Sequence, residues 1–366
     1  MKGSWKMDLT DPPNAAALPP GEQASPVTLQ SIAERANLHI STVSRALDPN
    51  PTRKVSAETV AIVRAIAKEL GFNPNPWARS LRTNRTRTLG LVIPRLVDNV
   101  LAVVFESAEF AALRLGYQAI TVSTGDDPAR TRNAVRLLLE RRVDGLVLAT
   151  ARLHDPIIDD LAARNVRFVL LGRSNGDHIA VRADDELGAY LATRHLLERG
   201  HSRIAHVSGI AGTSTATARR AGYTRALQTA GIALDESMVF DSELGIDSGL
   251  AIGRTLLVQD PRPTAIFAAN DYVAIGLMAA ARDLGLRVPD DVAFVGYNDT
   301  RIGEAMFVPL SSVSIPLPTM GSRAVETLID LIEGRPVESE LYPAQLRIRA
   351  SSSLRKGPSL IGHDEV

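Results

Sequence analysis

The sequence predicts an α/β protein in which a small N-terminal head of three helices, with a helix-turn-helix, precedes a two-lobed body of parallel sheets. Two observations support this fold class. Residues 27–87 are basic and carry apolar residues at helical spacing. From Thr88 onward, short apolar strands alternate with helices in two similar runs of roughly 100 residues each. Such alternation is typical of parallel sheets covered by helices on both faces.

The composition excludes several classes of protein. The chain has 366 residues, of which 45% are hydrophobic and 22% charged, as in ordinary globular proteins. It has no cysteine, which excludes disulfides, cysteine-bound zinc, iron–sulfur clusters and thiol nucleophiles. No apolar stretch approaches the ~18 residues of a membrane span, and residues 1–26 lack the apolar core of a secretory signal. We expect a disordered leader at 1–26, a cytoplasmic location, no membrane contact, no metal and no cofactor.

The net charge of zero hides an asymmetry along the chain. Residues 27–87 hold ten Lys or Arg and four Asp or Glu, a net charge of +6, whereas residues 88–366 have a net charge of −5. A compact basic segment joined to a mildly acidic body is typical of nucleic-acid binders. Chance clustering of solvated charges is the alternative.

The head is expected to contain three short helices. Residues 28–36 carry apolar residues at helical spacing, with Thr28 as the N-cap, and a second helix follows at Ile40–Leu47. A third helix begins after Ser56 and ends at Gly71. The first two helices and their short turn predict a helix-turn-helix.

In a helix-turn-helix, the second helix enters the major groove of DNA. Ile40, Ser41 and Arg45 would then face the bases, and Arg45 can form a bidentate contact with guanine worth about 1–3 kcal/mol of discrimination. The hydroxyls expected at phosphates are Thr28, Ser31, Thr42 and Ser44. The alternative is a helical hairpin with a merely solvated Arg45.

Residues 76–87 are expected to form a hinge helix and linker. The helix at Pro76–Leu81 is too short to be stable alone, so it would fold against DNA or a second copy, which implies a homodimer. Leu81 is placed to wedge between base steps in the minor groove. The arginines expected to follow the DNA backbone are Arg79, Arg82, Arg85 and Arg87.

The head resembles the lactose-repressor (LacI/GalR) family of transcription factors. The segments that carry the resemblance are VTLQSIAERANLHISTVSRAL (27–47), VSAET (55–59) and NPNPWARSL (73–81). The resemblance implies that Arg45 reads the major groove and that Leu81 is the minor-groove lever. Two departures stand out. His39 replaces the usual serine cap, which we expect to weaken the start of the second helix, and the loop Asp48–Lys54 is longer than usual.

The body resembles the family's periplasmic-binding-protein-like effector domain. The segments that carry this resemblance are RRVDGLVL (141–148), LATRHLLERGHSRIAHVSG (191–209), RRAGYTRAL (219–227), PTAIFAANDYVAIGLM (263–278), RVPDDVAFVGYND (287–299) and GSRAVETLIDLIEG (321–334). It implies crossings between lobes near Asp185, Ser314 and Leu341. The expected parts are a DNA-binding domain at 27–75, a first lobe at 88–185 with 315–341, a second lobe at 186–314 with 342–354, and a flexible tail at 355–366.

The resemblance also implies a small-molecule effector, a sugar or another metabolite, in a cleft at the carboxyl ends of the strands. The positions that match the family's ligand contacts are Arg173, Asp184, Asp185, Arg219, Leu244, Asn270 and Asn298. Asn298 stands where aspartate is common, which removes a charge-assisted acceptor, and Leu244 stands where a stacking aromatic is common. The segment LVDNVLAVVF (96–105) lacks the usual N-P-F-F. These changes disfavour a pyranose and favour an acidic or more apolar ligand. Alternatively, several of these polar groups only form hydrogen bonds between the lobes.

The sequence therefore predicts a DNA-binding transcriptional regulator, a repressor that acts as a homodimer on a pseudo-palindromic double-stranded operator and is not an enzyme. The alternative is a solute-binding protein without a DNA function. A hydrolase is a third interpretation, because Gly172–Gly176 matches G-x-S-x-G, but we expect a strand rather than a helix after Ser174. His195 is expected on a helix surface and His206 in a strand, without metal-ligand spacing.

Overall fold

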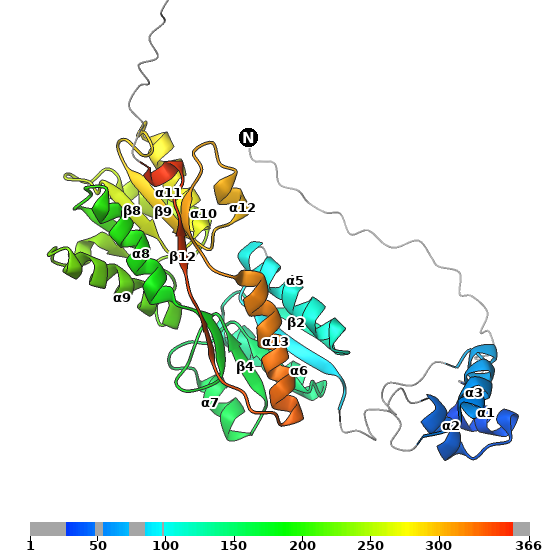
Figure 1. The fold of residues 1–366 in the computed structure, drawn as a ribbon. Coiled ribbons are helices and arrows are strands. Elements are labelled where there is room, and N and C mark those ends of the chain that lie inside the picture. Colours follow the sequence, from blue (N-terminus) through cyan, green and yellow to red (C-terminus); the bar gives the residue numbers. More distant parts are fainter. Residues whose placement is uncertain (1–26, 48–53, 73–84, 97–98, 354–366) are drawn as a thin grey trace, which may run out of the picture. The chain divides into compact units, whose positions relative to one another are not determined.

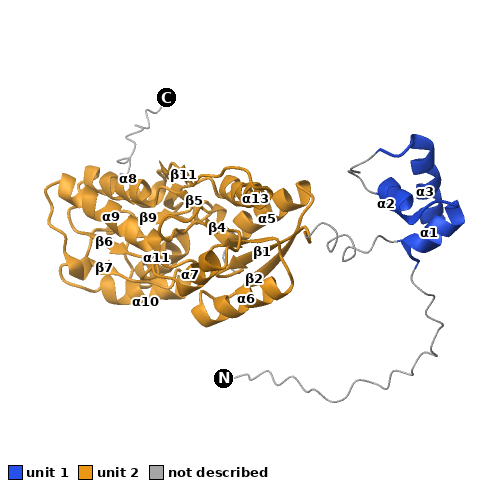
Figure 2. Ribbon diagram, turned by 90° about the horizontal axis from the view of Figure 1, so that it is seen from below, with its two compact units in different colours: residues 1–82 blue, residues 83–366 orange. Residues whose placement is uncertain are grey.

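The structure is a computed structural model that describes residues 27–47, 54–72, 85–96 and 99–353. The chain divides into two compact units, residues 1–82 and 83–366 (Figure 2). Among the described residues, no helix combines the length and apolar character that a bilayer span requires. Several expectations lie outside the described residues, namely those for the leader at 1–26, residues 48–53, Pro76–Leu81, Arg79, Leu81, Arg82 and the tail at 355–366.

Unit 1 contains the three helices that the sequence predicts. They are α1 (Leu29–Ala36), α2 (Ile40–Leu47) and α3 (Ala57–Glu69). Thr28 caps α1, because its side chain accepts a hydrogen bond from the Ser31 N–H at 3.3 Å, and Ser31 accepts one in return from the Thr28 N–H. Ile32, Val43 and Val63, one from each helix, are fully buried and form the core of this unit.

The turn between α1 and α2 departs from one expectation. Asn37 adopts a left-handed conformation with a φ of 51° and ends α1. The ring Nδ1 of His39 lies 3.2 Å from the backbone nitrogen of Ser41 and 2.8 Å from its hydroxyl. His39 therefore caps α2 with a ring nitrogen in place of a serine hydroxyl, contrary to the expectation of a weakened start.

Unit 2 contains two six-stranded sheets. The first sheet is parallel throughout, in the order β11-β5-β4-β3-β1-β2. Its strands are β1 (Thr88–Ile93), β2 (Gln118–Ser123), β3 (Gly145–Leu148), β4 (Phe168–Leu171), β5 (Ala180–Ala183) and β11 (Glu340–Tyr342). The helices on it are α5 (Asn99–Arg114), α6 (Pro128–Glu140), α7 (Pro156–Ala163) and α13 (Leu317–Glu333). We call this sheet and its helices the first lobe.

The second sheet has the order β12-β10-β9-β8-β6-β7 and is parallel except for β12, which runs antiparallel to β10. Its strands are β6 (Ile204–Val207), β7 (Val239–Phe240), β8 (Ala265–Ala268), β9 (Ala293–Tyr297), β10 (Ser311–Ser314) and β12 (Gln345–Arg347). The helices on it are α8 (Asp185–Glu198), α9 (Ser214–Thr229), α10 (Ile246–Leu256), α11 (Asp271–Asp283) and α12 (Arg301–Glu304), with short 3-10 turns at Glu236–Met238 and Ala350–Ser352. We call this sheet and its helices the second lobe.

Each sheet is covered by helices on both faces, as the alternation of strands and helices predicts (Figure 1). In β1, Leu89, Leu91 and Ile93 pack toward α5 and α13, whereas Val92 packs toward α6 and α7. In the second lobe, α10 and α11 cover one face and α8 and α9 the other. Most successive parallel strands are joined by a helix that brings the chain back, so the parallel strands of each sheet end at the same edge.

The chain changes sheets three times. It leaves the first sheet after β5, returns between Ser314 of β10 and Leu317 of α13, and leaves again between Tyr342 and Gln345. Leu341 lies within β11 and pairs with the first sheet, immediately before the last crossing. These connections bring the carboxyl ends of strands from both sheets to the region between the lobes.

One side chain lies elsewhere than the sequence predicts. His195 is buried rather than on a helix surface, because residues 350–352 cover it and its Nε2 lies 2.8 Å from the Ser352 hydroxyl. Arg85 and Arg87, which were expected along DNA, also contact other residues of unit 2. Arg85 donates to the carbonyl of Ile332 at 3.1 Å, and the Arg87 guanidinium lies 5.4 Å from the ring centroid of Tyr117.

Candidate functional site

One face of α2 carries the side chains that were expected to read DNA bases. Ile40 is 39% exposed and Ser41 is exposed, while Val43 and Ala46 on the opposite face are buried. The Arg45 side chain lies back along its own helix, where Nε donates to the Ser41 carbonyl at 2.9 Å and Nη2 to the Thr42 hydroxyl at 3.4 Å. These bonds use two of the five N–H groups of the guanidinium, so it keeps donors for another partner.

Some of the hydroxyls expected at phosphates already form hydrogen bonds within unit 1. Thr28 and Ser31 bond to each other in the α1 cap, with 3.1 Å between their oxygens. Thr42 accepts from Arg45, and Ser44 is half-buried on α2. A phosphate at the start of α1 would therefore compete with the cap for the same hydroxyls.

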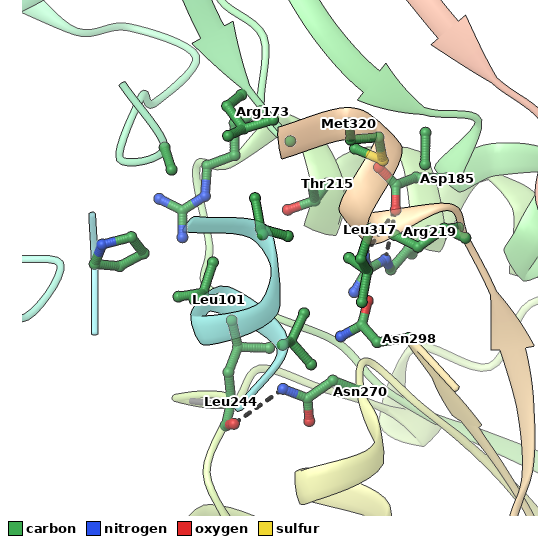
Figure 3. Close-up of a pocket in the computed structure, with 18 residues that line it drawn as sticks. Leu101, Arg173, Asp185, Thr215, Arg219, Leu244, Asn270, Asn298, Leu317 and Met320 are labelled. Atoms are coloured by element: carbon green, nitrogen blue, oxygen red, sulfur yellow. Dashed lines mark hydrogen bonds and ion pairs between the residues drawn. The ribbon is translucent and has the colours of Figure 1, made fainter. Parts of the chain in front are cut away.

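A cavity of about 140 Å³, the inner cavity, lies between the two lobes of unit 2 where their strands end (Figure 3). Six of the seven expected effector contacts line it, namely Arg173, Asp185, Arg219, Leu244, Asn270 and Asn298. Asp184 does not line it, because its carboxylate caps α8 by accepting from the Leu187 N–H at 2.9 Å. The rest of the polar lining is Thr215, and the first lobe adds mainly apolar side chains.

Arg219 and Asp185 form a buried ion pair at the polar end of the inner cavity. Nε and Nη2 of Arg219 lie 2.8 and 2.7 Å from Oδ1 of Asp185, and Nη1 donates to the Ala269 carbonyl at 2.5 Å. The guanidinium also stacks on Tyr297, 3.7 Å from the ring centroid. Burial opposes the charge of Arg219, yet the carboxylate of Asp185 raises the pKa of the guanidinium above its usual range. The two residues predicted to bind a ligand therefore neutralise each other.

Arg173 is neutralised in the same way. Its Nη1 and Nη2 donate to the two oxygens of Asp126 at 2.9 and 2.7 Å, and both side chains are nearly buried. Beside this pair lies a second, outer cavity of about 250 Å³, whose lining includes Arg95 and Tyr272. The two cavities share Pro94, Leu101, Arg173 and Leu244.

Asn270, the N-cap of α11, holds one loop of the second-lobe wall of the cleft in place. The side chain of Asn270 caps α11 by accepting from the Val273 N–H at 2.8 Å, and its amide donates to the Leu244 carbonyl at 3.0 Å. Leu244 has a φ of 62°, a left-handed conformation that a side chain other than glycine seldom adopts. The hydrogen bond from Asn270 helps to hold this conformation, which directs Leu244 into both cavities.

Asp271, the first residue of α11, holds the loop at residues 298–300 on the same wall. Asp271 accepts from the Ser312 hydroxyl at 2.5 Å and from the Thr300 N–H at 2.6 Å, and the Asp299 N–H donates to Ser312 at 3.0 Å. Burial is the main cause that raises the pKa of Asp271 to about 6. These bonds fix the turn at Asn298, which has a φ of 94°.

Asn298 directs its side chain toward the inner cavity (Figure 3). Its backbone N–H donates to the Val313 carbonyl at 2.8 Å. Within the part of the chain that the structure describes, its side-chain amide has no hydrogen-bond partner. Asn298 therefore presents both a donor and an acceptor to the space between the lobes.

Direct hydrogen bonds join the lobes beside the cavities. The Leu153 N–H donates to the Gly212 carbonyl at 3.0 Å, and the Ser174 N–H donates to the Ser214 hydroxyl at 2.8 Å. Ser174 thus links the two lobes through its backbone. The next regular element after it is the strand β5, so the turn lacks the helix that a nucleophile elbow requires.

The comparisons with known proteins agree with this arrangement of head and cleft. Residues 28–75 match bacterial regulatory proteins of the lacI family, and residues 193–352 match a periplasmic binding protein-like domain. The HTH-type transcriptional repressors PurR of Vibrio atlanticus and Erwinia tasmaniensis are 31% and 33% identical to the chain, with 90% of this chain and 98% of each repressor covered. The chain belongs to the lacI family.

Solved structures of this family have the same fold. The lac repressor dimer bound to operator and the anti-inducer ONPF gives a TM-score of 0.81 at 28% identity, covering 90% of this chain and 99% of that one. The complex of the transcriptional regulator CelR with cellobiose gives 0.69 at 31% identity, covering 89% and 99%. The predicted family, fold class and role as a DNA-binding transcriptional regulator are confirmed.

Sequence reasoning missed the apolar half of this lacI-family cleft. Leu101 and Val104 on α5 and Leu317 and Met320 on α13 line the inner cavity from the first lobe. The two helices approach closely at Gly321, where a Cβ would lie 2.1 Å from the Val104 carbonyl oxygen. The apolar segment 96–105 carried a signal for the α5 side chains, but nothing in the sequence pattern pointed to the start of α13.

Proposed function

We propose that this lacI-family regulator is a repressor that reads its operator through Ile40, Ser41 and Arg45 of α2. The observation that carries the proposal is that Ser41 and Arg45, one helical turn apart, share a face of α2 away from the buried Val43, with the exposed Ile40 at its edge. A helix that packs by one face and offers an arginine on the other can enter a major groove. Arg45 would leave the Ser41 carbonyl and turn both Nη groups toward a guanine.

The proposed repressor acts as a homodimer on a pseudo-palindromic operator, and large apolar side chains on unit 2 support a second copy as partner. Phe110 and Leu113 on α5 are 63% and 67% exposed, and Phe307, just after α12, is fully exposed. Both helices lie on the same side of unit 2 in the view of Figure 1. Contiguous exposed apolar patches mark protein interfaces, so a second copy that covers these side chains would remove them from water.

The effector site of the proposed repressor is the inner cavity. Its lining comes from both lobes, so a bound ligand favours one relative position of the lobes over others. Because two copies would hold two heads, a change in lobe position alters the spacing of the heads. Ligand affinity and operator affinity are then linked reciprocally.

The test of base reading is selection of binding sites for the full chain from a random duplex pool, followed by affinity measurements at two salt concentrations. We expect a symmetric consensus with a guanine in each half-site. Arg45→Ala should lose about 1–3 kcal/mol of discrimination at that guanine and keep most of its non-specific binding. Arg82→Ala should instead weaken binding to all sequences and reduce the dependence on salt.

Arg35→Ala is the matched control, because Arg35 is an exposed arginine of unit 1 that pairs with Glu69 at 2.5 Å. It should leave the consensus unchanged. An equal loss of affinity on all sequences for Arg45→Ala would contradict direct reading by Arg45. No enriched sequence under any ligand condition would contradict the proposed function itself.

A further inference from the structure

We propose that the inner cavity takes a small uncharged ligand with an apolar body and one or two hydroxyl or carbonyl groups at one end. This inference rests on the proposed function, because it names the chemical class of the effector. It differs from the polyhydroxylated sugar that the complex of CelR with cellobiose holds. Four features of the cavity support it, and each concerns a different property of the ligand.

The first feature is size. The inner cavity measures about 140 Å³. An engineered cavity of about 150 Å³ in another protein takes up a benzene ring, so a single six-membered ring is a suitable body for this one. A disaccharide would need more space than the inner cavity alone provides.

The second feature is the polarity of the first-lobe wall. Val100, Leu101 and Val104 of α5, together with Leu171, Leu317 and Met320, surround the body of the ligand with carbon and one thioether sulfur. A hydroxyl turned toward this wall would lose its hydrogen bonds to water and gain none. A sugar ring, which carries hydroxyls on nearly every carbon, is therefore disfavoured, whereas a ring substituted at one end is favoured.

The third feature is charge. Of the described residues that line the inner cavity, three are charged: Arg219 and Asp185 pair with each other, and Arg173 pairs with Asp126. A ligand anion would find each cation already bound by a carboxylate that would repel the anion. Arg95 lines the outer cavity and not the inner one, so its charge lies outside the proposed ligand site. The balance of charges therefore favours a neutral ligand and argues against the acidic one that the sequence left open.

The fourth feature is the polar end. Asn298 directs an amide without a hydrogen-bond partner among the described residues toward the cavity, and Arg219 has N–H groups beyond those that bond to Asp185 and Ala269. A ligand oxygen at this end can accept from both side chains, and a ligand hydroxyl can donate to the Asn298 carbonyl. The described residues that line the inner cavity include no aromatic ring, so they offer a flat heterocycle no stacking partner.

The test uses four compounds that share one six-carbon ring: cyclohexanol, trans-1,2-cyclohexanediol, myo-inositol and cyclohexanecarboxylate. The full chain is titrated with each compound at millimolar concentration, and binding is measured by calorimetry and by the shift in Tm. We expect cyclohexanol and the diol to bind at least about tenfold more tightly than myo-inositol and the carboxylate. Binding of myo-inositol or of the carboxylate as tight as that of cyclohexanol would overturn the proposal, as would no binding of any of the four.

Two methionine variants locate the binding. Met320→Gln places an amide in the apolar wall and should weaken the binding of cyclohexanol roughly 3- to 10-fold. Met306→Gln is the control, because Met306 is half-buried outside the cavity, and it should leave the affinity unchanged. Equal weakening by both variants would show that cyclohexanol does not bind in the inner cavity and would overturn the proposal.

Operator binding, measured on the same preparation with the selected duplex, separates this inference from the function on which it rests. If the chain binds the operator but the four compounds do not bind in the expected order, the ligand class is wrong and the proposed function stands. If the chain binds cyclohexanol as expected but selects no operator, the proposed function fails while the assignment of the cavity stands.

Discussion

The two walls of the inner cavity are held in place by different forces. On the first-lobe side, Leu101 and Met320 are carried by α5 and α13, which pack directly together at Gly321. On the second-lobe side, Arg219 and Asn298 are positioned by an ion pair and by hydrogen bonds at the ends of strands. The first-lobe wall sets the size of the space, and the second-lobe wall sets the orientation of the polar groups. Stability should therefore depend on charge and pH in variants of the second-lobe wall, and on the volume of the new side chain in variants of the first-lobe wall.

The largest expected effect comes from breaking the ion pair of the second-lobe wall. Arg219→Met removes the guanidinium and leaves the Asp185 carboxylate buried without its partner. We expect the free energy of unfolding to fall by about 3–5 kcal/mol, because an uncompensated buried charge is strongly unfavourable. Urea unfolding followed by circular dichroism measures this loss.

Arg136→Met is the matched control, since Arg136 pairs with Glu140 at 2.6 Å on the surface of α6, with side chains 58% and 56% exposed. Exposed pairs contribute little, so this variant should lose less than about 1 kcal/mol. Similar losses for the two variants would mean that burial of the Arg219 pair has no energetic weight.

The next effect concerns pH and a histidine close to the same wall. His206 is fully buried in β6, in a stack with the rings of Phe267 and Tyr223, and burial lowers its pKa to about 4. In the unfolded chain the pKa is near 6.5, so the unfolded state binds the proton more readily between pH 6.5 and 4. Folding stability is therefore lost as the pH falls through this window, by up to about 3 kcal/mol.

Removing the imidazole isolates this contribution. In His206→Phe, the difference in unfolding free energy from the unmodified chain should change by about 3 kcal/mol between pH 7 and pH 4, in favour of the variant at low pH. Asp271, whose pKa is raised to about 6, stabilises the folded state as the pH falls, but it is present in both proteins and cancels in the difference. Parallel stability curves for the two proteins would refute a buried neutral His206.

The smallest effect concerns the first-lobe wall. Gly321→Ala places a methyl group 2.1 Å from the Val104 carbonyl oxygen, so α5 and α13 must separate. We expect a loss of about 1–3 kcal/mol in unfolding free energy, as for other overpacked sites, without any change in pH dependence. Thermal and urea unfolding test this, with Thr319→Ala, at an exposed position of the same helix, as the control. An unchanged stability would mean that the two helices can move apart freely.

Sequence reasoning predicted the elements of both units well, because their periodic apolar residues and caps are local signals. The α2 helix was predicted with its observed bounds, Ile40–Leu47, and the change to alternating strands and helices was predicted at Thr88, where β1 begins. The buried position of His195 was missed, since it depends on residues 350–352, which lie far away in sequence. The hydrogen bond from Arg85 to the carbonyl of Ile332 was not predicted, for the same reason.

The sequence predicted which residues lie at the candidate cleft but not which side chains they contact. Asp185 and Arg219 were expected to contact a ligand, and the structure pairs them with each other. Such a pairing needs the relative positions of α8 and α9, which no local pattern encodes. Asn270 and Asp271, at the start of α11, bind two loops from elsewhere in the second lobe. Only the three-dimensional structure reveals these contacts, because the loops lie far from α11 in sequence.

The loop at Leu244 also has a consequence for how new members of the family arise. Its left-handed conformation is held through backbone atoms, by Asn270 at the carbonyl and by the Ser242 hydroxyl at the N–H, and neither bond involves the leucine side chain. A mutation at position 244 can therefore exchange the side chain that meets the ligand while the loop keeps its course. Under the proposed function, this position offers an evolving lineage a change in the lining of the cavity in one step, while the bonds that shape the loop stay in place.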